Sequence, residues 1–89
     1  MLETTMIPRK LGQVEVNELE DGFIIQRDDT VHIVNESGKM ILDLCDGEKS
    51  IADIISAMKE MFAAEQDAEY VVEFIQNLIE AELVAVQNG

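Results

Sequence analysis

The pattern of apolar and polar residues divides the chain into two parts. From Val14 to Val34, three short apolar segments are separated by two turn signals. The segments are VEVNEL, FIIQR and TVHIV, and the turns are Glu20-Asp21-Gly22 and Asp28-Asp29. This spacing predicts a three-stranded antiparallel meander with strands of roughly five residues.

The second and third strands of this meander are apolar on both faces. If Asp28-Asp29 is a two-residue turn, side chains that alternate along the strands divide into two sets. One face carries Phe23, Ile25, His32 and Val34, and the other carries Ile24, Val31 and Ile33. We expect one face to pack on helices, and the other to meet either the N-terminal segment or a partner protein.

After Val34 the apolar residues recur at helical spacing. Asn35 is a suitable N-cap for a first helix over ESGKMILDLC, and Gly47 ends it. Ser50 and Asp53 match a capping box with Asp in place of Glu, which predicts a second helix over IADIISAMKEMF.

A third helix is predicted from Ala68 to about Glu82, with Asp67 as its N-cap and LVAV as a short extended piece after it. Residues 1–12 show little periodicity and are predicted to form a flexible N-terminal arm. We therefore place the domain at residues 13–86 and a tail at residues 87–89. Three strands followed by three helices predict an α+β fold.

Composition narrows the classes of partner. The 89 residues include 19 acidic and six basic ones, for a formal charge of -13. Such a chain is poorly suited to nucleic acid or to an anionic membrane, because both are bound through Lys and Arg. No stretch is long and apolar enough to span a bilayer, and the N-terminus lacks the apolar core of a signal peptide. We expect a cytoplasmic location.

The residues that usually carry catalysis are scarce. The chain has one histidine, His32, in the middle of the third predicted strand, and one cysteine, Cys45, on the apolar face of the first helix. We interpret both as packed or strand residues and predict no enzyme activity, no metal site and no cofactor. Asp43 and Asp46 should raise the pKa of the Cys45 thiol.

Carboxylates are abundant but spread along the chain. Asp43, Asp46, Glu48 and Asp53 come closest to a cluster, yet they lack the spacing of a calcium loop. The final third holds seven acids and no Lys or Arg. That acidic segment is either a solvated helix face or a docking surface for a basic partner.

The segment VHIVNESGKMILDLCDGEKSIADII carries the most specific signal. A strand ends in Asn35, an apolar helix runs into Leu44-Cys45-Asp46-Gly47, and a Ser50-capped helix follows. This segment resembles the PqqD-like family, the peptide chaperones of pyrroloquinoline quinone biosynthesis, whose fold is also a recognition element in pathways of ribosomally made, modified peptides. The resemblance covers roughly residues 14–84.

The resemblance implies a winged-helix-like domain that binds no DNA and adds the leader segment of a precursor peptide as an extra strand beside its third strand. It further implies delivery of that peptide to a modifying enzyme, often a radical SAM protein. The leader's side chains would enter a groove between the third strand and the third helix. The peptide-binding residues expected on this basis are Thr30, Val31, His32, Ile33, Val34, Tyr70, Phe74, Asn77 and Leu78.

The third helix has a wider apolar arc than a core contact requires. Its apolar residues cover nearly half of the helix circumference, whereas a stripe of about 100° is enough to bury a helix. Tyr70, Phe74, Asn77 and Leu78 occupy one flank, and Val72 and Ile79 the other. We favour the Tyr70–Phe74 flank for the groove, because aromatic side chains suit peptide pockets. In the alternative, the whole arc belongs to the core.

Three functions compete. The first is the peptide-binding adaptor, and its acidic excess predicts basic residues on the leader or on the enzyme. The second is an acidic structural subunit of a larger enzyme. The third is a winged-helix transcription factor, which the shortage of basic residues disfavours. An unpaired third strand also permits a weak homodimer in place of a monomer.

Overall fold

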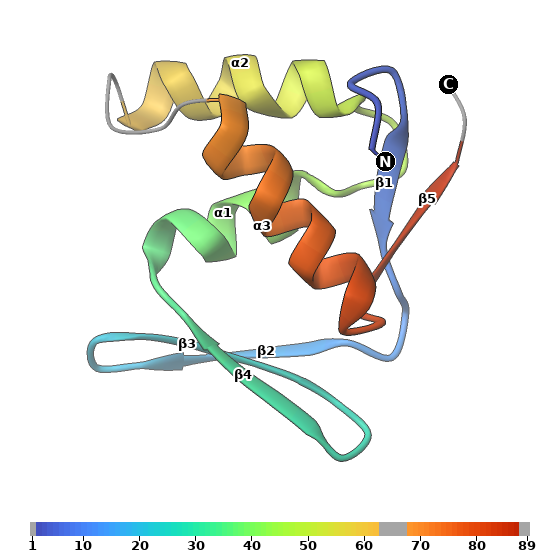
Figure 1. Ribbon diagram of the computed structural model, residues 1–89. Coiled ribbons are helices and arrows are strands. Elements are labelled where there is room, and N and C mark those ends of the chain that lie inside the picture. The colour runs from blue at the N-terminus through green and yellow to red at the C-terminus, as the bar shows by residue number, and fades with distance from the viewer. Residues whose placement is uncertain (1, 63–67, 88–89) are drawn as a thin grey trace.

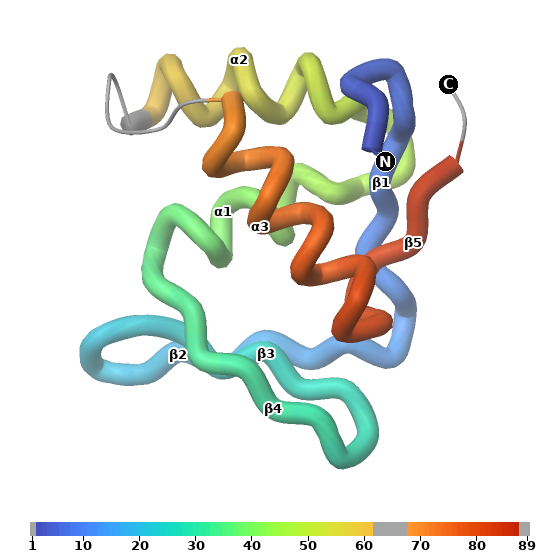
Figure 2. The backbone as a smooth tube through the Cα atoms, viewed as in Figure 1, coloured from blue at the N-terminus to red at the C-terminus, as the bar shows by residue number. Residues whose placement is uncertain are grey.

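The computed structural model describes residues 2–62 and 68–87 (Figures 1 and 2). The elements in chain order are β1 (Ile7–Lys10), β2 (Glu15–Leu19), β3 (Gly22–Arg27), β4 (Thr30–Val34), α1 (Glu36–Leu44), α2 (Ile51–Phe62), α3 (Ala68–Glu80) and β5 (Val84–Gln87). The predicted α+β order of a meander followed by three helices is confirmed. No helix in the described part of the chain is long and apolar enough to cross a membrane.

Strands β2, β3 and β4 form the antiparallel meander that the sequence predicts. Two-residue turns connect them, because Leu19 pairs with Gly22 across the first hairpin and Arg27 with Thr30 across the second. Asp28 has a φ of 52°, the left-handed conformation that two-residue hairpin turns require. The predicted division of side chains between the two faces of β3 and β4 follows from this register.

The helices lie on one side of this sheet (Figure 1). The face with Ile25 points toward them, and Ile25 is fully buried. On the opposite face Val31 and Ile33 remain 54% and 73% exposed, so the N-terminal segment does not cover them. The buried apolar core is Val14, Ile25, Ile41, Leu42, Cys45, Ile51, Ile54, Ile55, Met58, Val71, Ile75, Leu78, Leu83 and Val84.

Two of the predicted helix starts are confirmed at atomic detail. The Asn35 side chain accepts a hydrogen bond from the Gly38 N–H at 2.9 Å, as an N-cap should. Ser50 and Asp53 form a reciprocal capping box, in which each backbone N–H donates to the other residue's side chain. Asp67, the predicted N-cap of the third helix, lies outside the described residues.

The flexible arm predicted for residues 1–12 is wrong for residues 7–10. These form β1, which pairs antiparallel with β5 from the other end of the chain. Pro8 is fully buried, and its carbonyl accepts a hydrogen bond from Gly47 at 3.0 Å. Proline fits here because β1 is an edge strand, where a residue without a backbone N–H need not interrupt the hydrogen bonds between the paired strands. The packed structure therefore extends N-terminal to residue 13.

Candidate functional site: a groove between strand β4 and helix α3

One edge of strand β4 pairs with no strand in the described part of the chain. The strand ends the sheet order β2-β3-β4. Because the Arg27–Thr30 pair closes a two-residue turn, the backbone of Thr30 points toward β3. Backbone groups alternate along an antiparallel strand, so those of Val31 and Ile33 point toward the open edge. No proline or lysine interrupts Thr30–Val34, and edge strands usually carry such residues as protection.

A groove of about 220 Å³ lies between β4 and the C-terminal half of α3. Its walls are mainly apolar, with one side supplied by the strand and the other by the helix and the residues after it. Leu78 and Leu83 are buried at its base, and Phe74 is half-buried. The lining residues are His32, Ile33, Val34, Phe74, Asn77, Leu78, Ala81 and Leu83.

Gly38 in α1 determines the position of the Phe74 side chain, which forms part of one wall of the groove. A Cβ atom at Gly38 would lie 2.7 Å from Cζ of Phe74 and 3.1 Å from Cβ of Val34. Glycine therefore allows the Phe74 ring to lie directly against α1, beside the end of β4. The Tyr70 ring stacks on Phe74 from the preceding helical turn, with centroids 6.3 Å apart.

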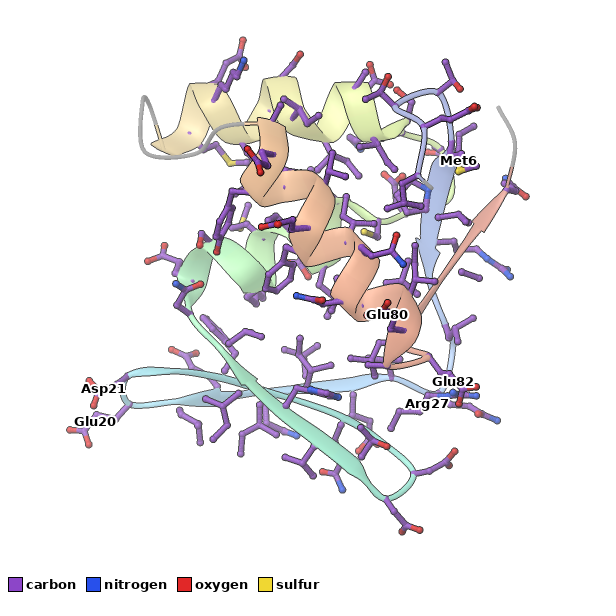
Figure 3. All side chains as sticks on the ribbon, viewed as in Figure 1. Met6, Glu20, Asp21, Arg27, Glu80 and Glu82 are labelled. Carbon is purple, nitrogen blue, oxygen red and sulfur yellow. The ribbon has the colours of Figure 1, made fainter. Side chains whose placement is uncertain are left out.

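Side-chain contacts connect the sheet with α3 at one end of the groove. The Arg27 guanidinium donates from Nη1 to the Glu82 carbonyl at 2.8 Å, and the Glu82 carboxylate lies 3.7 Å away (Figure 3). Glu82 has a φ of 62°, which turns the chain sharply after α3 and directs Leu83 into the core. Arg27 thus joins the β3–β4 hairpin to the end of α3 and helps to set the spacing of the groove walls.

Polar contacts join α1 to α3 near the other end. Ser37 is buried, and its hydroxyl donates to the Asn35 side chain at 2.9 Å. The same hydroxyl lies 3.3 Å from the Tyr70 hydroxyl, and either group can be the donor. The segment that links β4 to α1 is therefore held against the first turns of α3.

The structure brings together most of the residues expected at a peptide site. His32, Ile33 and Val34 meet Phe74, Asn77 and Leu78 in the groove, so the Phe74 flank of the helix is the one that faces β4. Thr30, Val31 and Tyr70 do not line it. Ala81 and Leu83 also line the groove but are not among the residues expected from the sequence. The LVAV segment directly after the helix is an apolar signal that points to this region.

His32 places a polar ring in this apolar wall. It pairs with Ile25 across the sheet and is partly buried. Its Nε2 atom is buried and has no hydrogen-bond partner among the described residues. A buried polar atom left unsatisfied costs about 1–3 kcal/mol, so His32 is the residue of this wall at which a polar group would be stabilised.

The opposite flank of α3 borders a wider, more polar hollow of about 590 Å³. It is lined by Leu2, Val72, Glu73, Gln76, Asn77 and Glu80. Two carboxylates and two amides make this hollow unlike the apolar groove at β4. The structure therefore separates the two flanks of the helix by chemistry as well as by position.

Cys45 and the acidic cluster of the sequence have structural partners. Burial, followed by the charge of Asp46, raises the pKa of the Cys45 thiol to about 12. The thiol donates to the Ile41 carbonyl at 3.2 Å. The Asp46 carboxylate accepts from Lys49 Nζ at 2.6 Å and from two backbone N–H groups. These hydrogen bonds, that of Lys49 first, lower the pKa of Asp46 to about 2.

Comparison with protein families decides the family. The family model described as "Coenzyme PQQ synthesis protein D (PqqD)" matches residues 22–84, well over half of the sequence. The chain belongs to the PqqD family. The description of this family refers to the synthesis of coenzyme PQQ.

The PqqD fold of this chain also occurs inside a much larger enzyme. A solved structure, "Structure of the heterocyclase TruD", superposes with a TM-score of 0.67 at 14% sequence identity. The alignment covers 92% of this chain and 12% of the heterocyclase chain. At this identity the likeness concerns the fold alone. A comparison with curated proteins gave no match.

Proposed function

We propose that this protein binds the leader segment of a ribosomally made precursor peptide and delivers it to a modifying enzyme in the cytoplasm. The observation that carries the proposal is the unpaired edge of β4 beside an apolar groove. The protein itself performs no chemistry in this scheme. The resemblance supplies the class of the enzyme, a radical SAM protein.

The leader adds to β4 as an antiparallel strand. The outward backbone groups of Val31 and Ile33 supply the hydrogen bonds, which are independent of the leader's sequence. Every second side chain of an added strand points to the same face. The leader's alternate side chains thus point to the α3 side and enter the groove beside Phe74 and Leu78. Selectivity comes from those side chains, which must be apolar to match the walls.

The surrounding charge favours a leader with basic residues. Asp28 and Asp29 stand at one end of β4, and Glu36 follows its other end. The nearby cations are already engaged, because Arg27 contacts Glu82 and Lys39 pairs with Asp43. Lysine or arginine beside the apolar leader residues would gain favourable interactions and associate faster at low salt.

The test is a titration of the isotope-labelled protein with the precursor peptide encoded beside its gene. We expect NMR shifts concentrated in Thr30–Val34 and in α3 from Phe74 to Leu78. The affinity should fall as salt rises from about 50 to 500 mM. Absence of binding at high micromolar peptide, or shifts confined to other elements, would refute strand addition.

A matched pair of variants isolates the backbone contribution. Val31→Pro removes an N–H that faces the open edge, whereas Val31→Thr keeps it and retains a β-branched side chain. One lost backbone hydrogen bond is worth about 1.5 kcal/mol or less, so Val31→Pro should weaken the leader by up to about tenfold. Val31→Thr should bind within about twofold of the parent. Equal binding by both variants would show that the peptide does not pair with β4.

A further inference from the structure

The sheet face that points away from the helices carries an exposed apolar patch. Leu19, Val31 and Ile33 are 39%, 54% and 73% exposed, and Ile24 lies between β2 and β4 on the same face. We call these four residues the outer patch. In Figures 1 and 2 all three helices lie on the other side of the sheet, and the β1–β5 ribbon stands to one side. No described element covers the outer patch.

The border of the outer patch is acidic. Both hairpin turns of the sheet are pairs of acids, Glu20-Asp21 and Asp28-Asp29, at opposite ends of the meander (Figure 3 labels the first pair). Residues 15–34 contain six acids and a single Lys or Arg, and that residue, Arg27, binds Glu82. The outer face of the sheet is therefore apolar at its centre and acidic at its border.

This charge distribution argues against a second copy of the chain as the occupant. Two copies stacked through this face would bring acidic borders together, and each chain has a net charge of -13. Like charges placed across an interface cost several kcal/mol. A partner surface with basic residues at its border would instead have favourable electrostatic interactions with these acids.

We propose that the outer patch docks a partner protein whose contact surface is apolar at its centre and bordered by Lys and Arg. In taking that partner to be the modifying enzyme, the inference rests on the proposed function. Side chains of β4 alternate between the outer face of the sheet and the face toward α3, and Ile33 borders both the outer patch and the leader groove. Both ligands can therefore bind at once.

The arrangement also gives a route for presentation. A leader added to β4 extends the sheet by one strand, and its outward side chains continue the outer patch. The partner then contacts protein and peptide on one continuous surface. It should bind the protein–leader complex more tightly than the protein alone, and linkage requires the partner to tighten leader binding by the same factor.

The partner is found and tested in two steps. A photo-crosslinking residue is placed at position 33 of the full chain, and at exposed position 56 on α2 as a control, in cells that carry the native pathway. The protein captured at position 33 is identified and purified. Its affinity is then measured for the parent, for Leu19→Thr/Ile24→Thr, which changes the two residues of the outer patch that lie outside β4, and for Met61→Thr, which changes a 46% exposed apolar residue on a different surface.

The expected result is a loss of at least about tenfold in partner affinity for the double variant and less than about twofold for Met61→Thr. Affinity should also fall with salt. Leader binding should stay within about twofold in the double variant, because Leu19 and Ile24 lie in β2 and β3 and do not line the leader groove, and threonine is well tolerated in a strand. That control separates the two proposals, since failure of leader binding to the parent would count against the proposed function instead.

Several results would overturn the docking proposal. These are no adduct at position 33 above that at position 56, an adduct with a second copy of the chain, and a partner affinity that the double variant leaves unchanged. If the affinity of a captured partner did not change with salt, the proposal that its contact surface is bordered by basic residues would be wrong.

Discussion

Replacing Gly38 by alanine tests whether the Phe74 wall of the groove is fixed. The new Cβ would lie 2.7 Å from Cζ and 3.0 Å from Cε2 of Phe74. Ordinary carbon contacts begin near 3.5 Å, so the ring would have to move by about 1 Å. Val34 Cβ, at 3.1 Å from the same position, restricts movement of the methyl group in the other direction.

Two effects of this substitution oppose each other. Alanine favours a helix interior over glycine by about 1 kcal/mol. Overpacking of a well-filled site costs about 1–3 kcal/mol. The difference is a net loss of about 1 kcal/mol in the free energy of unfolding, which corresponds to a decrease of about 4–8 °C in Tm for a domain of this size. Leader affinity should fall as well, because the displaced ring narrows the groove.

Gly12→Ala is the matched control. A Cβ atom at Gly12 meets nothing within 4 Å, so the same chemical change should alter stability by less than about 0.5 kcal/mol. Thermal and urea unfolding followed by circular dichroism measure both variants. A second substitution, Phe74→Leu, should recover part of the lost free energy of unfolding when it is made in the Gly38→Ala variant. The same substitution made in the parent should give no such gain. A Gly38→Ala protein as stable as the parent, or absence of that recovery, would refute the reasoning.

Three further predictions concern the helix junctions. Ser50→Ala should lower the free energy of unfolding by about 1 kcal/mol through loss of the capping box, whereas Ser56→Ala on the exposed face of α2 should leave it nearly unchanged; equal effects in urea unfolding would contradict the box. Because the pKa of Asp46 is lowered from 3.8 to about 2 in the folded protein, its stabilising contribution is present above pH 4 and is lost as the pH falls toward 2. Asp46→Asn should therefore show a smaller decrease in Tm than the parent over that interval, and parallel curves would contradict this. Cys45 should resist a thiol reagent at pH 8 in the native protein and react at once in guanidinium, since its pKa is raised to about 12; rapid native labelling would show that the thiol is accessible.

The local parts of the fold were predictable because each depends on a few neighbouring residues. Asn35 and the Ser50–Asp53 box give helix starts whose partners lie three residues away. The Asp28-Asp29 turn sets the register of β3 and β4, and with it the face on which each side chain lies. These features require no knowledge of the rest of the chain.

The pairing of β1 with β5 was not predictable in the same way. Each strand has only four residues, and Ile7 pairs with Gln87 from the far end of the chain. No periodicity extends over so short a segment, and Pro8 reads locally as a strand breaker. The burial of Pro8 and the Gly47–Pro8 hydrogen bond come from tertiary packing alone.

The candidate groove was predictable in its elements but not in all its residues. The apolar arc of α3 exceeded what a core contact needs, and the Phe74 flank does face β4. Ala81 and Leu83 line the groove because the left-handed turn at Glu82 folds the chain back under the helix. The sequence around Glu82 has no glycine to mark that turn. The roles of all these residues in peptide binding stay predictions.

The pairing of β1 with β5 also allows this fold to be carried within a larger protein. Because Ile7 and Gln87 are paired, chain that continues from either end departs from one place on the molecule, beside α2 and away from the β3–β4 hairpin (Figure 1). A larger protein can therefore carry the fold as an insertion, with its entry and exit side by side and the groove unobstructed. In the heterocyclase, the part that matches this fold is 12% of the chain. A fusion made at either end would therefore leave β4 and the groove beside it accessible.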